Sequence, residues 1–180
     1  DGVHPVYSSC ERTLHFSLGL YKACYTSMST DFETVLERTF RIKPMKPHLE
    51  ITEENMAALQ AFAATHNAPI VMVNLMQIRP TACYEDPALN DCSGYEAFAR
   101  YTQGSSEVRQ QAGADLIWSG RALQMPIGPS EKTWDLVALV RYPSAKAYIE
   151  MIATKAYAAA RAHRRAALYD SRLIMTIENA

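Results

Sequence analysis

The chain has 180 residues, of which 48% are hydrophobic and 21% are charged, as expected of one globular domain or of one domain with an extension. Eighteen basic side chains against nineteen acidic ones give a net charge of −1. This balance argues against nucleic acid and anionic membranes as partners, because both attract proteins by bulk charge. No apolar run approaches the roughly 20 residues of a transmembrane helix. We therefore expect a soluble, compact protein with one hydrophobic core.

The first part of the chain differs in composition from the rest. Ala23 is the single alanine before Ala57, and the early region is rich in Ser and Thr and holds two of the four cysteines. Residues 43–48 include two prolines, which resist both helix and central strand. We therefore predict an N-terminal extension over residues 1–47 and a second domain over residues 48–180.

The cysteines leave the cellular compartment open. Reduced thiols in a cytoplasmic protein are the favoured interpretation, because disulfides are rare in the cytosol. The chain starts without an initiator Met or a signal-peptide pattern, which is also compatible with a processed mature end. The alternative is therefore a secreted or periplasmic protein with Cys10/Cys24 and Cys83/Cys92 disulfides.

Two helices are expected before the main body of the domain. Acidic residues in a first turn and apolar residues at helical spacing predict a helix from Ser29 or Thr30 to Phe40. Thr52 is a candidate N-cap for a second helix, which should stop before Pro69.

The main body has the order β-α-β-β-α-β. One helix is expected from Gly94 to about Gln111, with Gly113 ending it, and another from Ser144 to about Leu168. Runs of apolar residues predict the strands over 70–76, 114–120, 134–142 and 173–177.

This order predicts a ferredoxin-like α+β sandwich, in which the helices cover one face of the sheet. The strands are apolar on both faces, so the open face is expected to bury itself in a homodimer. Cover by the N-terminal extension is the alternative.

Several segments of the domain resemble a known family. They are the strand from Pro69 to Leu75 with Tyr84, the helix start at 94–98, and the Trp-Asp…Arg-Tyr-Pro-Ser strand at 134–144. Together they resemble the domain-of-unknown-function 1330 family, in the dimeric α/β-barrel superfamily, over about residues 48–178. The resemblance implies a small-molecule pocket between sheet and helices. Superfamily relatives include cofactor-independent monooxygenases, polyketide cyclases, isomerases and haem-handling proteins, so it implies no single activity.

Asn74 and Arg141 are polar residues inside otherwise apolar strands. An unpaired buried amide costs roughly 1–3 kcal/mol, so Asn74 should either hold a substrate oxygen or bond a neighbouring backbone group. The resemblance favours the pocket role. Arg141 needs an anionic partner, for which Asp135 and a substrate carboxylate are the alternatives.

Aromatic and histidine side chains supply the other candidates. Tyr101 and His163 are the residues expected to move a proton. For His163, a solvated position near the end of its helix is the simpler interpretation. The expected substrate-binding residues are Tyr84, Tyr95, Trp118, Trp134, Tyr142 and Tyr157, with Tyr148 placed similarly. For each tyrosine, packing in the core is the alternative.

The sequence shows no machinery for a metal or a nucleotide. Its histidines and cysteines lack paired-ligand spacing, and it has no Gly-rich phosphate loop and no G-x-S-x-G elbow. We therefore expect no metal site and no cofactor. The predicted function is a cofactor-independent monooxygenase, cyclase or isomerase acting on an aromatic or polyketide-like small molecule. A non-catalytic protein binding a small ligand or haem, and a structural assembly protein, are the alternatives.

Overall fold

The structure, a computed structural model, describes residues 47–128 and 134–178. The helix predicted to end at Phe40, together with Cys10 and Cys24, lies outside these residues. The described elements are α3 (Glu53–Thr65), β1 (Ile70–Ile78), a 3-10 helix (Pro87–Leu89), α4 (Gly94–Gly104), α5 (Ser106–Gln111), β2 (Asp115–Arg121), β3 (Leu136–Tyr142), α6 (Ala145–Ile152), α7 (Lys155–Ala167) and β4 (Leu168–Thr176). This order confirms the predicted ferredoxin-like α+β fold, with each predicted helix of the main body split in two.

The strands form one antiparallel sheet in the order β2-β3-β1-β4. Asn74 of β1 lies opposite Ala138 of β3 and Leu173 of β4. Directly opposed residues share a face of the sheet, and faces alternate along each strand. The even-numbered positions of β1 and β3 therefore point one way, and the odd-numbered positions point the other way.

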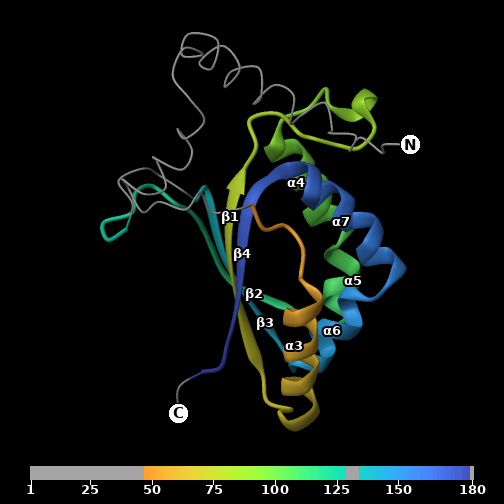
Figure 1. Cartoon of the computed structure of the whole chain (residues 1–180), viewed down its shortest axis with the longest axis vertical. Helices are drawn as coiled ribbons and strands as arrows, with labels where there is room; N and C mark the ends of the chain where they lie inside the picture. The colour runs from red at the N-terminus through yellow and green to blue at the C-terminus, as the bar shows by residue number, and fades with distance from the viewer. Residues whose placement is uncertain (1–46, 129–133, 179–180) are drawn as a thin grey trace, which may run out of the picture. The chain divides into compact units, whose positions relative to one another are not determined.

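Helices α4 to α7 cover one face of this sheet (Figure 1). Even-numbered residues of β1 and β3 pack against them, which identifies that face as the inner one. The buried residues form two clusters: Ile70, Met72, Val140 and Tyr142 with Tyr148 and Met151, and Met76 and Ile78 with Ala97, Ala167 and Leu168. The odd-numbered residues form the opposite face, called the open face below, which none of the described helices covers.

Both predicted long helices are interrupted at a hydroxyl residue. Ser105 separates α4 from α5, and its Oγ donates to the carbonyl of Tyr101 at 2.7 Å. Thr154 follows the end of α6 and caps α7, because its Oγ1 accepts from the backbone N–H of Tyr157 at 3.1 Å. Serine and threonine hydroxyls compete for backbone groups in this way, and here they turn the chain between helices.

The predicted helix ends agree with the structure where a cap marks them. Thr52 accepts from Asn55 N at the start of α3. Ser93 and Glu96 form a capping box at the start of α4. Gly113 follows α5 with a φ of +70°, a left-handed conformation that favours glycine.

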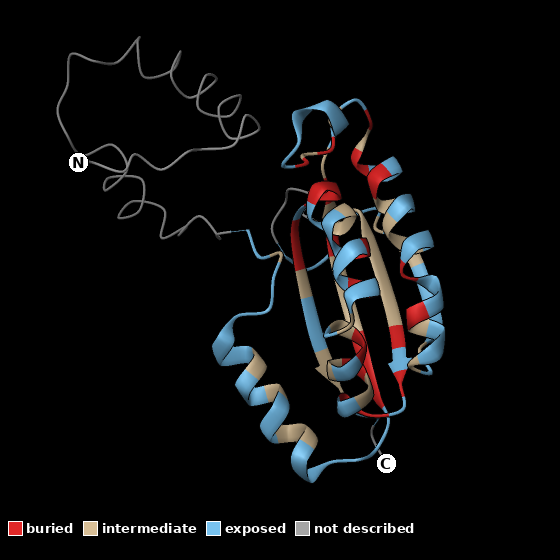
Figure 2. Cartoon of the chain, turned by 90° about the vertical axis from the view of Figure 1, so that its right-hand side faces the viewer, coloured by how far each residue is buried: buried red, intermediate tan, exposed pale blue. Residues whose placement is uncertain are grey.

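The segment before α3 is tied to β4 and α7. His48 N donates to Asp170 Oδ1 at 2.7 Å, and the N–H of Ser171 donates to the carbonyl of His48 at 3.0 Å. Arg164 Nη1 donates to the carbonyl of Leu49 at 3.0 Å. None of the residues of α3 is fully buried (Figure 2), and the partly buried Leu59, Phe62 and Ala63 pack against the core. This anchored segment therefore determines where α3 begins.

Candidate functional site

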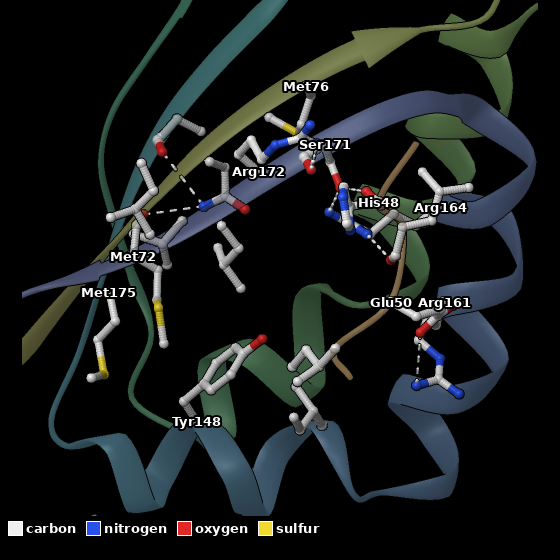
Figure 3. A pocket seen from close by; sticks show the side chains of 18 of the residues that line it. His48, Glu50, Met72, Met76, Tyr148, Arg161, Arg164, Ser171, Arg172 and Met175 are labelled. Carbon is white, nitrogen blue, oxygen red and sulfur yellow. Dashed lines mark hydrogen bonds and ion pairs between the residues drawn. The ribbon is translucent and has the colours of Figure 1, made fainter. Parts of the chain in front are cut away.

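A cavity of about 1160 Å³ lies between the inner face of the sheet and the helices. Its floor is mostly apolar, and in Figure 3 Met72, Met76 and Met175 lie on the strands, with Tyr148 across the cavity on a helix. Leu59 and Phe62 of α3 line it as well. The volume and the apolar lining suit an organic molecule of small to medium size.

Asn74 is a polar residue of the cavity floor. Its Nδ2 donates to the carbonyl of Met72 at 3.1 Å and to the carbonyl of Ala138 at 3.5 Å. The amide protons are therefore directed at the backbone, and Oδ1 is the atom left to accept a hydrogen bond. Asn74 thus lines the cavity and bonds neighbouring backbone groups, as the second predicted alternative has it, and its hold on a substrate oxygen stays a prediction.

Tyrosines line the cavity from both the sheet, where Tyr142 belongs to β3, and the helices. Tyr101, Tyr142, Tyr148 and Tyr157 all line the cavity. The hydroxyls of Tyr101 and Tyr157 lie 3.4 Å apart, and the rings of Tyr142 and Tyr148 meet edge to face with centroids 5.2 Å apart. Burial raises the pKa of Tyr148 to about 12 and moves the pKa of Tyr142 and of Tyr157 further upward. These three phenols stay neutral near pH 7, so they can donate hydrogen bonds but cannot act as bases.

Guanidinium groups surround this apolar space. The charged residues that line the cavity are Glu50, Arg109, Arg121, Arg161, Arg164 and Arg172. Arg161 pairs with Glu50 at 3.3 Å, and Arg172 pairs with Asp170 (Figure 3 labels both arginines). Arginines therefore outnumber carboxylates around the cavity, although the chain as a whole is nearly neutral.

Asn74, Tyr101, Tyr142 and Tyr157 are the predicted site residues that the structure brings together at the cavity. Arg141 lies on the open face of the sheet, because it opposes Val71. Its Nη2 pairs with Glu178 Oε1 at 2.7 Å, whereas Asp135 Oδ2 accepts from the N–H of Ile78. Arg141 therefore does not meet Asn74 within the described chain, and the expected partner Asp135 is wrong.

His163 and Tyr84 meet each other away from the cavity. Tyr84 Oη and His163 Nδ1 lie 2.8 Å apart, and the two rings are nearly perpendicular. Neither residue lines the cavity. The structure therefore brings these two predicted site residues together, but outside the cavity.

The other three predicted aromatic residues also lie elsewhere. Trp118 is 53% exposed, and its ring covers Gly120 so closely that a Cβ there would collide with it. Trp134 lies beneath the guanidinium of Arg172, 5.6 Å from the ring centroid, and Tyr95 is 51% exposed. The expectation that the two tryptophans wall the cavity is therefore wrong.

The described residues show no other site of a familiar kind. No group of three or more metal-ligating side chains occurs within 47–128 and 134–178, and no described helix is long and apolar enough to cross a membrane. Cys92 is a buried free thiol, so the Cys83/Cys92 disulfide of the secreted alternative is not formed.

Arg109 and Arg164 were not among the predicted site residues. Arg109 follows Tyr101 by eight residues and Arg164 follows Tyr157 by seven, which places each pair on one side of a helical stretch. This spacing from a tyrosine is the sequence signal that could have identified them. It points to the cavity only after the structure has shown that the tyrosines line it.

No protein-family model and no curated protein matches this chain. Among solved structures, the methylated RPA0582 protein is 38% identical, with a TM-score of 0.70, over 76% of this chain and 98% of that one. A second structure of RPA0582, a protein of unknown function from Rhodopseudomonas palustris, is 37% identical with a TM-score of 0.69, over 75% and 99% of the two chains. A dimeric ferredoxin-like protein of unknown function from Bacteroides fragilis is 9% identical with a TM-score of 0.40, over 60% and 94%.

Proposed function

This chain belongs to the same family as the RPA0582 protein of Rhodopseudomonas palustris, and from this premise we propose that it is a small-molecule enzyme of the dimeric α/β-barrel type. We also propose that it is a member of the domain-of-unknown-function 1330 family, as the motifs of its first and third strands suggest. The proposed reaction is a cofactor-independent monooxygenation, cyclisation or isomerisation of an aromatic or polyketide-like substrate.

The observation that carries the proposal is the apolar cavity whose polar groups converge from opposite sides. Buried, neutral phenols of Tyr148 and Tyr157 are suitable donors to a carbonyl oxygen that becomes an enolate oxygen. Asn74 Oδ1 is suited to accept from a hydroxyl of the substrate. Stabilising an enolate makes the neighbouring C–H bond easier to ionise, with the released proton passing to solvent water, and this step is common to all three reactions.

The open face of the sheet is the proposed homodimer interface. Val71, Val73, Leu75, Val137 and Leu139 occupy its odd-numbered positions. Trp118 and Ile174 add large apolar side chains that are 53% and 49% exposed in the single chain. Burying this surface against a second copy would remove it from water.

Binding to the cavity can be tested with N-phenyl-1-naphthylamine, a neutral dye that fluoresces in apolar surroundings. We expect saturable binding, which Ala138→Phe should weaken about tenfold or more by filling the floor. Ala99→Phe makes the same change on the exposed side of α4 and should leave binding unchanged. Equal binding by wild type and both variants would place the dye elsewhere and remove the cavity as its site.

Catalysis can be tested by incubating the protein with a panel of enolisable aryl ketones and diketones in deuterated buffer. We expect deuterium uptake next to the carbonyl, or turnover with oxygen, for part of the panel. Tyr157→Phe removes one buried donor and should slow the reaction about 100-fold. Tyr95→Phe removes an exposed hydroxyl outside the cavity and serves as the control. Ligands that bind without exchange or turnover would instead support the non-catalytic binding protein.

A further inference from the structure

We propose that the ligand of this cavity is an organic anion, whose charged group is recognised by Arg109 and Arg164. This inference rests on the proposed function only in requiring that the cavity binds a ligand. It holds equally for an enzyme and for a binding protein, because it concerns the charge of the molecule bound.

Arg109 is a half-buried cation that borders the cavity from α5. Its Nε donates to the carbonyl of Ser105 at 3.3 Å and its Nη2 to the carbonyl of Thr102 at 2.9 Å. The guanidinium also lies 6.0 Å from the centroid of the Tyr101 ring. All these partners are neutral, and within 47–128 and 134–178 no carboxylate forms an ion pair with Arg109. Its Nη1 has no hydrogen bond to a described residue, so three of the five N–H donors of this planar group remain, two on Nη1 and one on Nη2.

Arg164 is a second half-buried arginine that lines the cavity, and it belongs to α7. Its Nη1 donates to the carbonyl of Leu49, and its Nη2 donates to Ser171 Oγ at 3.1 Å (Figure 3). Glu50, the acidic residue of the cavity lining, pairs instead with Arg161 and Arg165. Arg161 and Arg165 therefore have a carboxylate partner, whereas the hydrogen bonds of Arg164 go to neutral oxygens.

The positive charges of the two guanidinium groups affect the pKa of the buried tyrosines. The charge of Arg109 lowers the pKa of Tyr142, although burial outweighs it, and the charge of Arg164 does the same for Tyr148 and Tyr157. Arg109 and Arg164 line the same cavity as Tyr101, Tyr148 and Tyr157, so one ligand in it can meet both kinds of donor. N–H and O–H donors converging on an apolar cavity suit a carboxylate or a similar oxyanion, because a charged acceptor strengthens each hydrogen bond.

A structural role for both arginines does not compete with this proposal. Arg109 satisfies carbonyls at the end of α4, and Arg164 ties the segment before α3 to β4. Each role uses one edge of the guanidinium and leaves other N–H groups available. Partly burying a cation without a counter-ion is costly, so a structural role alone would be served as well by a neutral side chain.

The test compares two dyes that differ in one charge. N-phenyl-1-naphthylamine and 1-anilinonaphthalene-8-sulfonate share the same rings, and the second carries a sulfonate. The readout is the ratio of their two dissociation constants on the full chain at physiological salt. We expect the anion to bind wild type about tenfold or more tightly than the neutral dye. In the double variant Arg109→Gln/Arg164→Gln the ratio should fall to about one, with binding of the neutral dye unchanged.

Arg161→Gln is the matched control. It removes the same charge from the same lining, but from a side chain that already pairs with Glu50, so the ratio should stay within about twofold. If the neutral dye binds wild type and the anion binds no more tightly, the charge inference is refuted while the cavity remains a binding site. If neither dye binds, the proposed function fails first. A ratio that the double variant leaves unchanged, with circular dichroism matching wild type, would also refute the assignment.

Discussion

Two glycines of one helix should respond in opposite directions to the same substitution. Gly94 opens α4 in a buried position, and Gly104 closes α4 on the surface. A Cβ on Gly94 would lie far inside contact distance of the Arg79 carbonyl oxygen and 2.9 Å from the carbonyl oxygen of Ala167. A Cβ on Gly104 would lie 3.6 Å from the Cβ of Ala160, which is an ordinary contact.

The magnitude follows from what must move. Both oxygens near Gly94 belong to backbone, and the N–H of Arg79 donates to the carbonyl of Ala167 at 2.8 Å, so neither can swing aside as a side chain would. Such overpacking costs roughly 1–3 kcal/mol and occasionally more. We therefore expect Gly94→Ala to lower the free energy of unfolding by about 3 kcal/mol, which is about 10 °C in Tm for a domain of this size. Gly104→Ala should raise it by about 0.5 to 1 kcal/mol, the helix-propensity difference.

Urea unfolding followed by far-ultraviolet circular dichroism measures both values, and differential scanning calorimetry gives the Tm. Because the two variants share the helix and the added methyl group, their difference isolates the close approach at Gly94. A Gly94→Ala protein as stable as wild type would refute the packing of the start of α4 against the end of α7. It would then also remove the geometric basis for the cavity between these helices and the sheet.

Three further outcomes are expected. Burial raises the pKa of the buried phenols, to about 12 for Tyr148. Their neutral state therefore stabilises the fold below pH 10, and this contribution is lost as the pH rises toward 12. Phenolate absorbance should then appear together with alkaline unfolding. The Ser93 N–H and hydroxyl lower the pKa of Glu96, so its contribution is present above the ordinary glutamate pKa and is lost as the pH falls through the lowered value; Glu96→Gln should flatten this part of the acid stability curve. Trp118→Arg should halve the mass seen by light scattering if the open face joins two copies, and an unchanged mass would exclude Trp118 from the interface.

The fold followed from the sequence because each element carried its own signal. Apolar runs identified the strands, and Thr52 and Gly113 marked helix ends with the chemistry that the structure uses. The interruptions at Ser105 and Thr154 were missed, because a hydroxyl residue inside an apolar helical pattern is locally compatible with a continuous helix. Tertiary packing, which the local pattern does not encode, favours a turn over a continuous helix at both residues.

The site was predicted less completely, because it depends on register. Asn74 and Arg141 both stand out in apolar strands, and nothing in either strand alone says whether they share a face. The pairing of Asn74 with Ala138, rather than with a neighbour of Ala138, sends Arg141 to the opposite side. His163 was predicted for its chemistry, but only the packing of α7 could show that it meets Tyr84 instead.

The backbone hydrogen bond between His48 and Ser171 has a consequence for how this sheet can associate. A sheet ordinarily has two bare edges, each able to recruit another strand and so to start an unlimited stack. Here His48, in the segment that enters α3, bonds the backbone of β4 at Ser171, while no described strand pairs with the outer edge of β2. If two copies paired through the β2 edge, neither copy would have a free edge left, so association would stop at a dimer. We therefore expect removal of the entry segment to cause a loss of colloidal stability before any loss of secondary structure.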